Sequence, residues 1–145
     1  MSRAFWLAAG AIYTIPRMVG EAVVHRSFLA LAAVFGLLAV AAGAFGAHAL
    51  ESRLSADRLA IFETAARYQM YHALALLAVA WLAGTTASAL LTAAGWAFVG
   101  GTVVFSGTLY LLALGGPRWL GAITPLGGLA FMVGWALVGL AALRT

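Results

Sequence analysis

The sequence contains no cysteine and very few charged residues, and each shortage excludes a class of protein. Without cysteine, the chain can form no disulfide, thiolate nucleophile, iron–sulfur ligand set or cysteine zinc site. Only 8% of its 145 residues are charged, whereas soluble domains carry about 25%. So few charges cannot cover the surface of a water-soluble domain, which excludes a soluble enzyme and a disordered segment.

The charges that are present are mostly basic, but they are scattered. The chain carries eight basic residues, all arginine, against four acids, for a formal net charge of +4. A nucleic-acid interface needs basic side chains gathered on one face, whereas these arginines occur singly along the chain. We therefore expect no nucleic-acid partner.

Long apolar stretches dominate the sequence. Hydrophobic residues make up 65% of the chain. A helix that spans a bilayer needs roughly 20 mostly apolar residues, and backbone groups in lipid must be paired internally. Four stretches qualify: about 27–50, about 68–83 as the end of a helix that starts near 55, about 88–114 and about 125–143. They predict an all-α integral membrane protein, folded as an antiparallel bundle of four transmembrane helices.

Residues typical of helix ends separate these stretches. Ser55 can act as the N-cap of the second helix. Thr124 followed by Pro125 is typical of an N-cap with proline at the first helical position. We therefore expect residues 120–123 to form a separate short segment before the fourth helix.

Residues 1–26 form an extension to the four-helix domain of residues 27–145. The apolar part of this extension, residues 4–15, is too short to span a bilayer and is followed by Pro16. We expect a helix that lies in the membrane interface. A signal-peptide core and a fifth span are the alternatives.

Small residues recur at seven-residue spacing within each predicted helix. Such a spacing places them on one face, where they let membrane helices approach closely. We expect these faces to form the helix contacts. The four sets are Gly36 and Gly43; Ala66, Ala73 and Ala80; Ala93, Gly100 and Gly107; and Gly127, Gly134 and Ala141.

Many of the polar side chains are expected at one end of the bundle. In an antiparallel bundle, the end of the first helix and the start of the second share a membrane face with the end of the third and the start of the fourth. A polar side chain at membrane depth is costly unless it finds a partner, so we predict a hydrogen-bonded cap there. Its members are His48, Glu51, Glu63, Arg67, Tyr68, Gln69, His72, Ser106, Tyr110 and Thr124.

The register of the second helix makes this prediction more specific. Gln69 falls on the same face as the small residues of its helix, so it should point into the bundle. His72 lies about 60° round the helix from Gln69 and is also expected to face inward. We expect Ser106 and Tyr110 on the third helix, with the free backbone groups near Thr124, to be their hydrogen-bond partners.

Short motifs in these four segments resemble one protein family. They are GAFGAH at 43–48, YQ at 68–69 with HALA at 72–75, FSG at 105–107, and ITP at 123–125 with GG at 127–128. Over about residues 28–144, the chain resembles the small bacterial inner-membrane proteins grouped as domain of unknown function 423, or uncharacterised protein family 0382; eukaryotic members are called transmembrane protein 256-like. The resemblance implies four transmembrane helices, no established activity, and both termini in the cytoplasm.

Three specific activities compete with a structural role for the polar residues. His48 and His72 could ligate a metal or haem, but a histidine that braces a helix contact needs no ligand. Glu63 and Arg67, spaced as a favourable ion pair, could relay protons with His72, but no charged residue continues the route across the membrane. Ser106 could be a nucleophile, but it lacks a G-x-S-x-G context.

We therefore expect a non-enzymatic protein without catalytic residues, bound metal or cofactor. Its predicted role is that of a structural or accessory component of the bacterial inner membrane, with membrane lipid, another membrane protein or a second copy of the chain as partner. The alternative is a protein that handles a small molecule or an ion through the polar cluster. The arginines do not indicate an orientation, because four lie on each predicted side.

Overall fold

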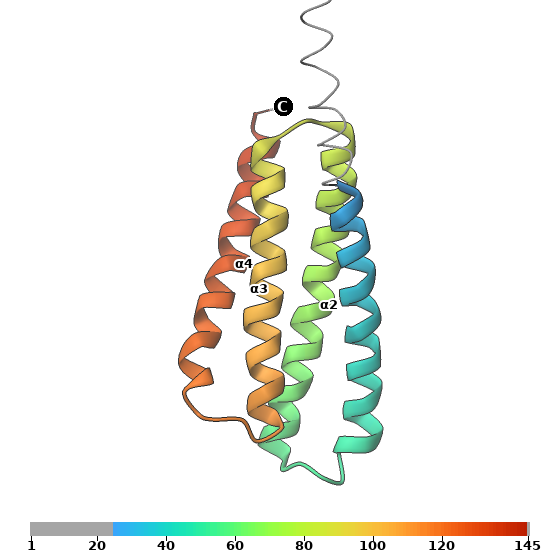
Figure 1. The fold of residues 1–145 in the computed structure, drawn as a ribbon, viewed down its shortest axis with the longest axis vertical. Coiled ribbons are helices and arrows are strands. Elements are labelled where there is room, and N and C mark those ends of the chain that lie inside the picture. Colours follow the sequence, from blue (N-terminus) through green and yellow to red (C-terminus); the bar gives the residue numbers. More distant parts are fainter. Residues whose placement is uncertain (1–24, 145) are drawn as a thin grey trace, which may run out of the picture.

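The computed structural model describes residues 25–144, and every regular element in that range is a helix. The first helix covers His25–Leu50, and its last turn is the π-helical element η1 (Gly46–Leu50). It is followed by α2 (Ala56–Thr85), α3 (Ala89–Ala113) and α4 (Leu120–Ala142). The four helices lie side by side and alternate in direction (Figure 1). The all-α prediction is thus confirmed for this range. Nearly all of the extension predicted as an interfacial helix, residues 1–24, lies outside it.

Three of the described helices are long and apolar enough to cross a membrane. These are the first helix, α3 and α4. The second helix, α2, is the longest at 30 residues, but its first half carries four charged side chains: Asp57, Arg58, Glu63 and Arg67. By length and composition, the described chain therefore contains three candidate spans and one helix that is longer but more polar.

The start of α4 differs from the prediction. Residues 120–123 are not a separate segment, because α4 begins at Leu120 and Pro125 lies inside it. Thr124 is therefore not an N-cap; its hydroxyl donates to the carbonyl of Leu120, one turn earlier in the same helix. The structure accommodates the proline because it removes only one backbone hydrogen bond, close to the helix start, and its φ is already helical.

The contact between α3 and α4 is close because aromatic rings pack against glycines. A Cβ atom at Gly101 would lie 2.5 Å from the ring of Phe131, and one at Gly134 would lie 2.5 Å from the ring of Phe98. At Gly127 a Cβ atom would lie 2.5 Å from the backbone nitrogen of Phe105. The small residues predicted for the face of α4 are therefore buried. Those predicted for α2 are buried as well.

The predicted small-residue faces of the other two helices are wrong. A Cβ atom at Gly36, Gly43, Gly100 or Gly107 would meet nothing within 4 Å. On α3 the glycines that make the close contacts are Gly95 and Gly101 instead. The reason is that glycine permits a close approach but does not create one; a bulky side chain from the neighbouring helix must fill the space.

The core is divided between the two ends of the bundle. The larger cluster, near the 86–88 connection, surrounds Phe28, Leu76 and Phe98, which are completely buried. Phe28 of the first helix also packs edge-on against Trp96 of α3. A smaller cluster near the other end contains Leu50, Phe62 and Ala113.

Candidate functional site

Four of the ten predicted site residues are buried in the bundle. Gln69 and His72 on α2, Ser106 on α3 and Thr124 on α4 are all buried. Their hydrogen bonds, however, do not join them into one network. Each side chain bonds to a different neighbour.

Gln69 and Ser106 hold α2 to its two neighbouring helices. The Gln69 Nε2 atom donates to the carbonyl of Phe35 on the first helix at 2.9 Å. The Ser106 hydroxyl donates to the carbonyl of Ala65 on α2 at 2.9 Å. The prediction that Gln69 points into the bundle is confirmed, whereas the expected pairing of Gln69 with Ser106 or Tyr110 is wrong. Both acceptors are backbone carbonyls, which every residue offers, so the sequence could not indicate which would be used.

Thr124 joins α4 to α3 through a residue that the sequence analysis missed. Its hydroxyl lies 2.8 Å from the hydroxyl of Thr108, which also bonds to carbonyls of the preceding turn. A hydroxyl inside an apolar helix must find an acceptor, and that signal could have added Thr108 to the predicted cluster.

His72 fills an aromatic space between α2, α3 and α4. Its ring stacks on Phe131 with centroids 3.4 Å apart and an interplanar angle of 5°, and it also contacts Phe98. The Nδ1 atom lies 2.8 Å from the carbonyl of Tyr68; since a carbonyl only accepts, Nδ1 carries the proton in this contact. The expected bond of His72 to Ser106 or Tyr110 is therefore wrong. The imidazole instead braces the three helices. Among residues 25–144 no group of three or more His, Cys, Asp or Glu side chains could hold a metal ion.

The other predicted residues are not part of this buried set. Five side chains are exposed. Two of them, Glu63 and Arg67, are not joined by any ion pair found among the described residues. Tyr110, near the end of α3, is intermediate between the two groups in burial. The structure thus separates the predicted polar cap into internal helix contacts and a set of exposed side chains. The exposed five are His48, Glu51, Glu63, Arg67 and Tyr68.

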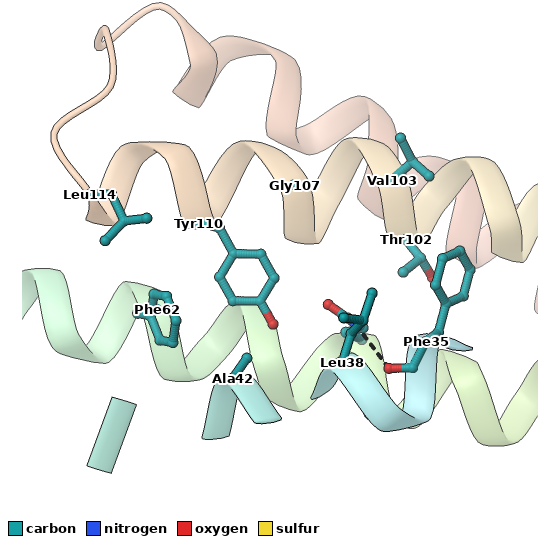
Figure 2. A pocket seen from close by; sticks show the side chains of 10 residues that line it. Phe35, Leu38, Ala42, Phe62, Thr102, Val103, Gly107, Tyr110 and Leu114 are labelled. Carbon is teal, nitrogen blue, oxygen red and sulfur yellow. Dashed lines mark hydrogen bonds between the residues drawn. The ribbon is translucent and has the colours of Figure 1, made fainter. Parts of the chain in front are cut away.

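A groove between the first helix and α3 is the most distinctive feature of this region (Figure 2). Its volume is about 450 Å³. We call it the lateral groove, because its rim residues Leu38, Val103 and Leu114 are exposed on the side of the bundle. The first helix and α3 form its walls and α2 forms its floor. It is lined by Phe35, Leu38, Ala42, Phe62, Gln69, Thr102, Val103, Gly107, Tyr110 and Leu114.

The lateral groove is open beside Gly107, where no atom of the first helix fills the space next to α3. Gly107 presents only open space to it. The Tyr110 ring packs against Phe62 of α2, with ring centroids 4.9 Å apart. Figure 2 shows this ring extending from α3 into the space beside Ala42 of the first helix. Tyr110 thus partly occupies the groove.

Two of the residues that line the lateral groove carry hydroxyl groups without partners. The Thr102 Oγ1 and Tyr110 Oη atoms are buried, and neither has a hydrogen-bond partner in the structure. Thr102, Ser106 and Tyr110 are spaced four apart and so form one stripe of α3. Ser106 and Tyr110 were predicted from the sequence, whereas Thr102 was not, although this spacing could have indicated it. It also missed the groove, which depends on helix separation rather than on any motif.

Comparisons with known proteins identify related sequences but no related structure. A family model described as "Protein of unknown function (DUF423)" matches residues 42–128. A UPF0382 membrane protein of Staphylococcus saprophyticus is 50% identical over 113 residues, which cover 78% of this chain and 93% of that protein. The UPF0382 membrane protein YwdK of Bacillus subtilis is 46% identical over 120 residues, which cover 82% of this chain and 98% of that protein. No solved structure matches.

Proposed function

We propose that this chain, which belongs to the UPF0382 family of bacterial membrane proteins, is a non-enzymatic accessory protein that binds a hydrophobic component of the membrane. The family model is described as a protein of unknown function. The proposed binding site is the lateral groove. The observation that carries this proposal is the groove itself, with its almost wholly apolar lining on the side of a membrane protein.

The arrangement of the buried polar groups supports binding over catalysis or transport. Gln69 and Ser106 are engaged with carbonyls of neighbouring helices, and His72 is engaged with the carbonyl of Tyr68. A nucleophile needs a base within hydrogen-bond reach, and the hydroxyl of Ser106 instead bonds to the carbonyl of Ala65. An ion would meet an apolar surface in the groove, which favours a hydrophobic occupant.

The proposal includes α2 as a fourth span, so that the protein crosses the inner membrane four times. The charges of α2 end at Arg67, and residues 68–85 contain none. Those 18 residues would extend about 27 Å as a helix, close to the hydrocarbon thickness of about 30 Å. We further propose, as the family resemblance implies, that both termini are cytoplasmic.

The absence of cysteine makes this topology directly testable. Single cysteines introduced as Ser52→Cys, Thr86→Cys and Pro117→Cys place one thiol in each connection. With four spans and cytoplasmic termini, a membrane-impermeant maleimide added to intact cells after removal of any outer membrane labels positions 52 and 117 but not 86. Labelling of 52 and 86 from the same side would contradict a membrane-spanning α2.

The binding function is tested by identifying what co-purifies with the full chain. The protein is extracted in a mild detergent and its bound components are identified by mass spectrometry, for the wild type and for Gly107→Leu and Gly100→Leu. Both glycines face open space, but only Gly107 lines the groove. We expect one stoichiometric hydrophobic component, retained in Gly100→Leu and lost in Gly107→Leu. The same bound components in all three proteins would overturn the proposal.

A further inference from the structure

The length of the lateral groove matches the depth of one membrane leaflet. Along α3 its lining extends from Thr102 to Leu114, a distance of about 18 Å in a helix. One leaflet of a bilayer contributes half of a hydrocarbon core of about 30 Å. Because Leu114 lines the groove and directly follows α3, one end of the groove lies next to the 114–119 connection. Its dimensions therefore suit one extended acyl chain that enters from that membrane face.

The chemistry of the groove changes along this length. Phe35, Leu38 and Val103 supply apolar lining at and near its Thr102 end, while Tyr110, whose hydroxyl is unpartnered, is a residue about one helical turn before the end of α3. An unpaired hydroxyl in hydrocarbon is costly, and phenols are favoured at the level of lipid headgroups. An ester carbonyl at the top of an acyl chain is an acceptor of the right kind at this depth. Side-chain adjustments of the size common on binding would bring the two together.

A guanidinium group lies near the Leu114 end of the groove. A Cβ atom at Gly115, the residue after the groove-lining Leu114, would lie 3.7 Å from Nη1 of Arg58. Arg58 also precedes the groove-lining Phe62 by one turn of α2, on the same face of the helix. Four arginines and three acids are found at this end of the molecule, so the net charge there is small. The position of Arg58 at the mouth is what favours an anion.

From these three features we infer that the lateral groove binds one anionic phospholipid molecule. One acyl chain lies in the groove, the ester carbonyl accepts a hydrogen bond from Tyr110, and the phosphate pairs with Arg58. The inference rests on the proposed function in taking the groove as a binding site, and it adds the chemical class of the occupant and the groups that select it.

The test is native mass spectrometry of the full chain in a non-ionic detergent. The protein is titrated separately with phosphatidylglycerol, with phosphatidylethanolamine of the same acyl chains, and with oleate. The variants are Arg58→Gln, Arg58→Lys, Tyr110→Phe and Gly107→Leu. Arg144→Gln, at the opposite end of the molecule, and Gly100→Leu are the matched controls. Circular dichroism and size-exclusion chromatography establish that each variant is folded.

We expect one phosphatidylglycerol per wild-type chain, bound about fivefold more tightly than phosphatidylethanolamine, the size of effect of one arginine near an anionic headgroup. Arg58→Gln should abolish this preference, while Arg58→Lys and Arg144→Gln keep it. Tyr110→Phe should weaken the binding of both lipids about threefold, as for one hydrogen bond within a membrane protein. Gly107→Leu should abolish binding of both lipids, and Gly100→Leu should bind both like the wild type.

The outcomes separate this inference from the proposed function. Equal affinity of the wild type for the two lipids, or a preference unchanged by Arg58→Gln, overturns the anionic phospholipid but leaves a binding groove if Gly107→Leu still abolishes occupancy. Tighter binding of oleate than of phosphatidylglycerol also overturns it, in favour of a free fatty acid. Binding that is the same in Gly107→Leu and Gly100→Leu removes the groove and with it both proposals. Because Arg58 is exposed, its variants still decide the matter if Gly107→Leu does not fold.

Discussion

Glycines on two faces of α3 have opposite surroundings. Gly101 packs against a phenylalanine of α4, whereas Gly107, less than two turns away, faces the lateral groove and meets nothing within 4 Å. The same residue type therefore makes a tight helix contact on one side and an open groove on the other. The comparison shows that the effect of a small residue on helix packing depends on the side chain that the neighbouring helix places opposite it.

The tight side is built from aromatic rings that fill the spaces left by glycine. Phe98 of α3 fits against Gly134, and Phe131 of α4 fits against Gly101. Membrane helices gain no hydrophobic driving force from association, so close van der Waals packing of this kind supplies much of the stability. The groove side lacks such a partner because the first helix presents Ala42 and Leu38 there, which do not reach across to Gly107.

The largest expected effect on the free energy of unfolding comes from adding a side chain at Gly127, where α4 packs closely against α3. Gly127→Leu places a side chain where a Cβ atom is already 2.5 Å from the backbone of Phe105, so the helices must separate. We expect a loss of about 3 kcal/mol in the free energy of unfolding, at the upper end of overpacking effects. The measurement is unfolding in mixed micelles with increasing SDS. Gly139→Leu is the control, because it is on the same helix and faces open space; equal stability of the two variants would contradict the tight contact.

A smaller loss is expected when the bond between α2 and the first helix is removed. Gln69→Ala deletes the donor to the Phe35 carbonyl and should reduce the free energy of unfolding by about 1–2 kcal/mol. Gln69→Leu should be tolerated better, since a leucine can repack the site without burying a polar group. Thr64→Ala is the control, because its hydroxyl bonds only within α2. If neither Gln69 variant differs from this control, the bond between the helices carries no stability.

Removing the Tyr110 hydroxyl should change the free energy of unfolding very little, in contrast to Gln69→Ala. Tyr110→Phe keeps the ring contact with Phe62 and removes a hydroxyl that has no partner in the structure. In lipid-free detergent the free energy of unfolding should stay within about 1 kcal/mol of the wild type. A loss as large as that of Gln69→Ala would show that the hydroxyl already has a protein partner.

The smallest expected effect on the free energy of unfolding comes from adding a side chain at Gly107, on the groove side of α3. Gly107→Leu adds a side chain to free space, so the free energy of unfolding should change by no more than about 0.5 kcal/mol, although binding in the groove is lost. The same SDS titration measures it. A loss approaching that of Gly127→Leu would mean that the first helix closes against α3 in the folded protein, and the two sides of α3 would no longer differ.

The helices were predictable because their signals are local. Apolar length indicated the first helix, α3 and α4, and Ser55 does precede α2, although its side chain makes no capping bond. The start of α4 was mispredicted because Thr124-Pro125 has the local chemistry of an N-cap, while the helix already begins at Leu120. Proline near a helix start is compatible with both arrangements.

The candidate site was predictable only in part. The inward direction of Gln69 followed from its register with Ala66 and Ala73, but its acceptor is a backbone carbonyl without any sequence signal. Glu63 and Arg67 had the spacing of an ion pair, yet both are exposed, where such pairs contribute little.

The amino-acid sequence by itself determined that this protein resides in a membrane, that its helices form from long apolar stretches, and that Gln69 and His72 face inward, because hydropathy and helical period act within each helix. Only the tertiary structure decided which glycines are in contact, which carbonyl each buried donor reaches, and that a groove remains between the first helix and α3. These features depend on the spacing between helices, which is set by the side chains of two or three segments packing together.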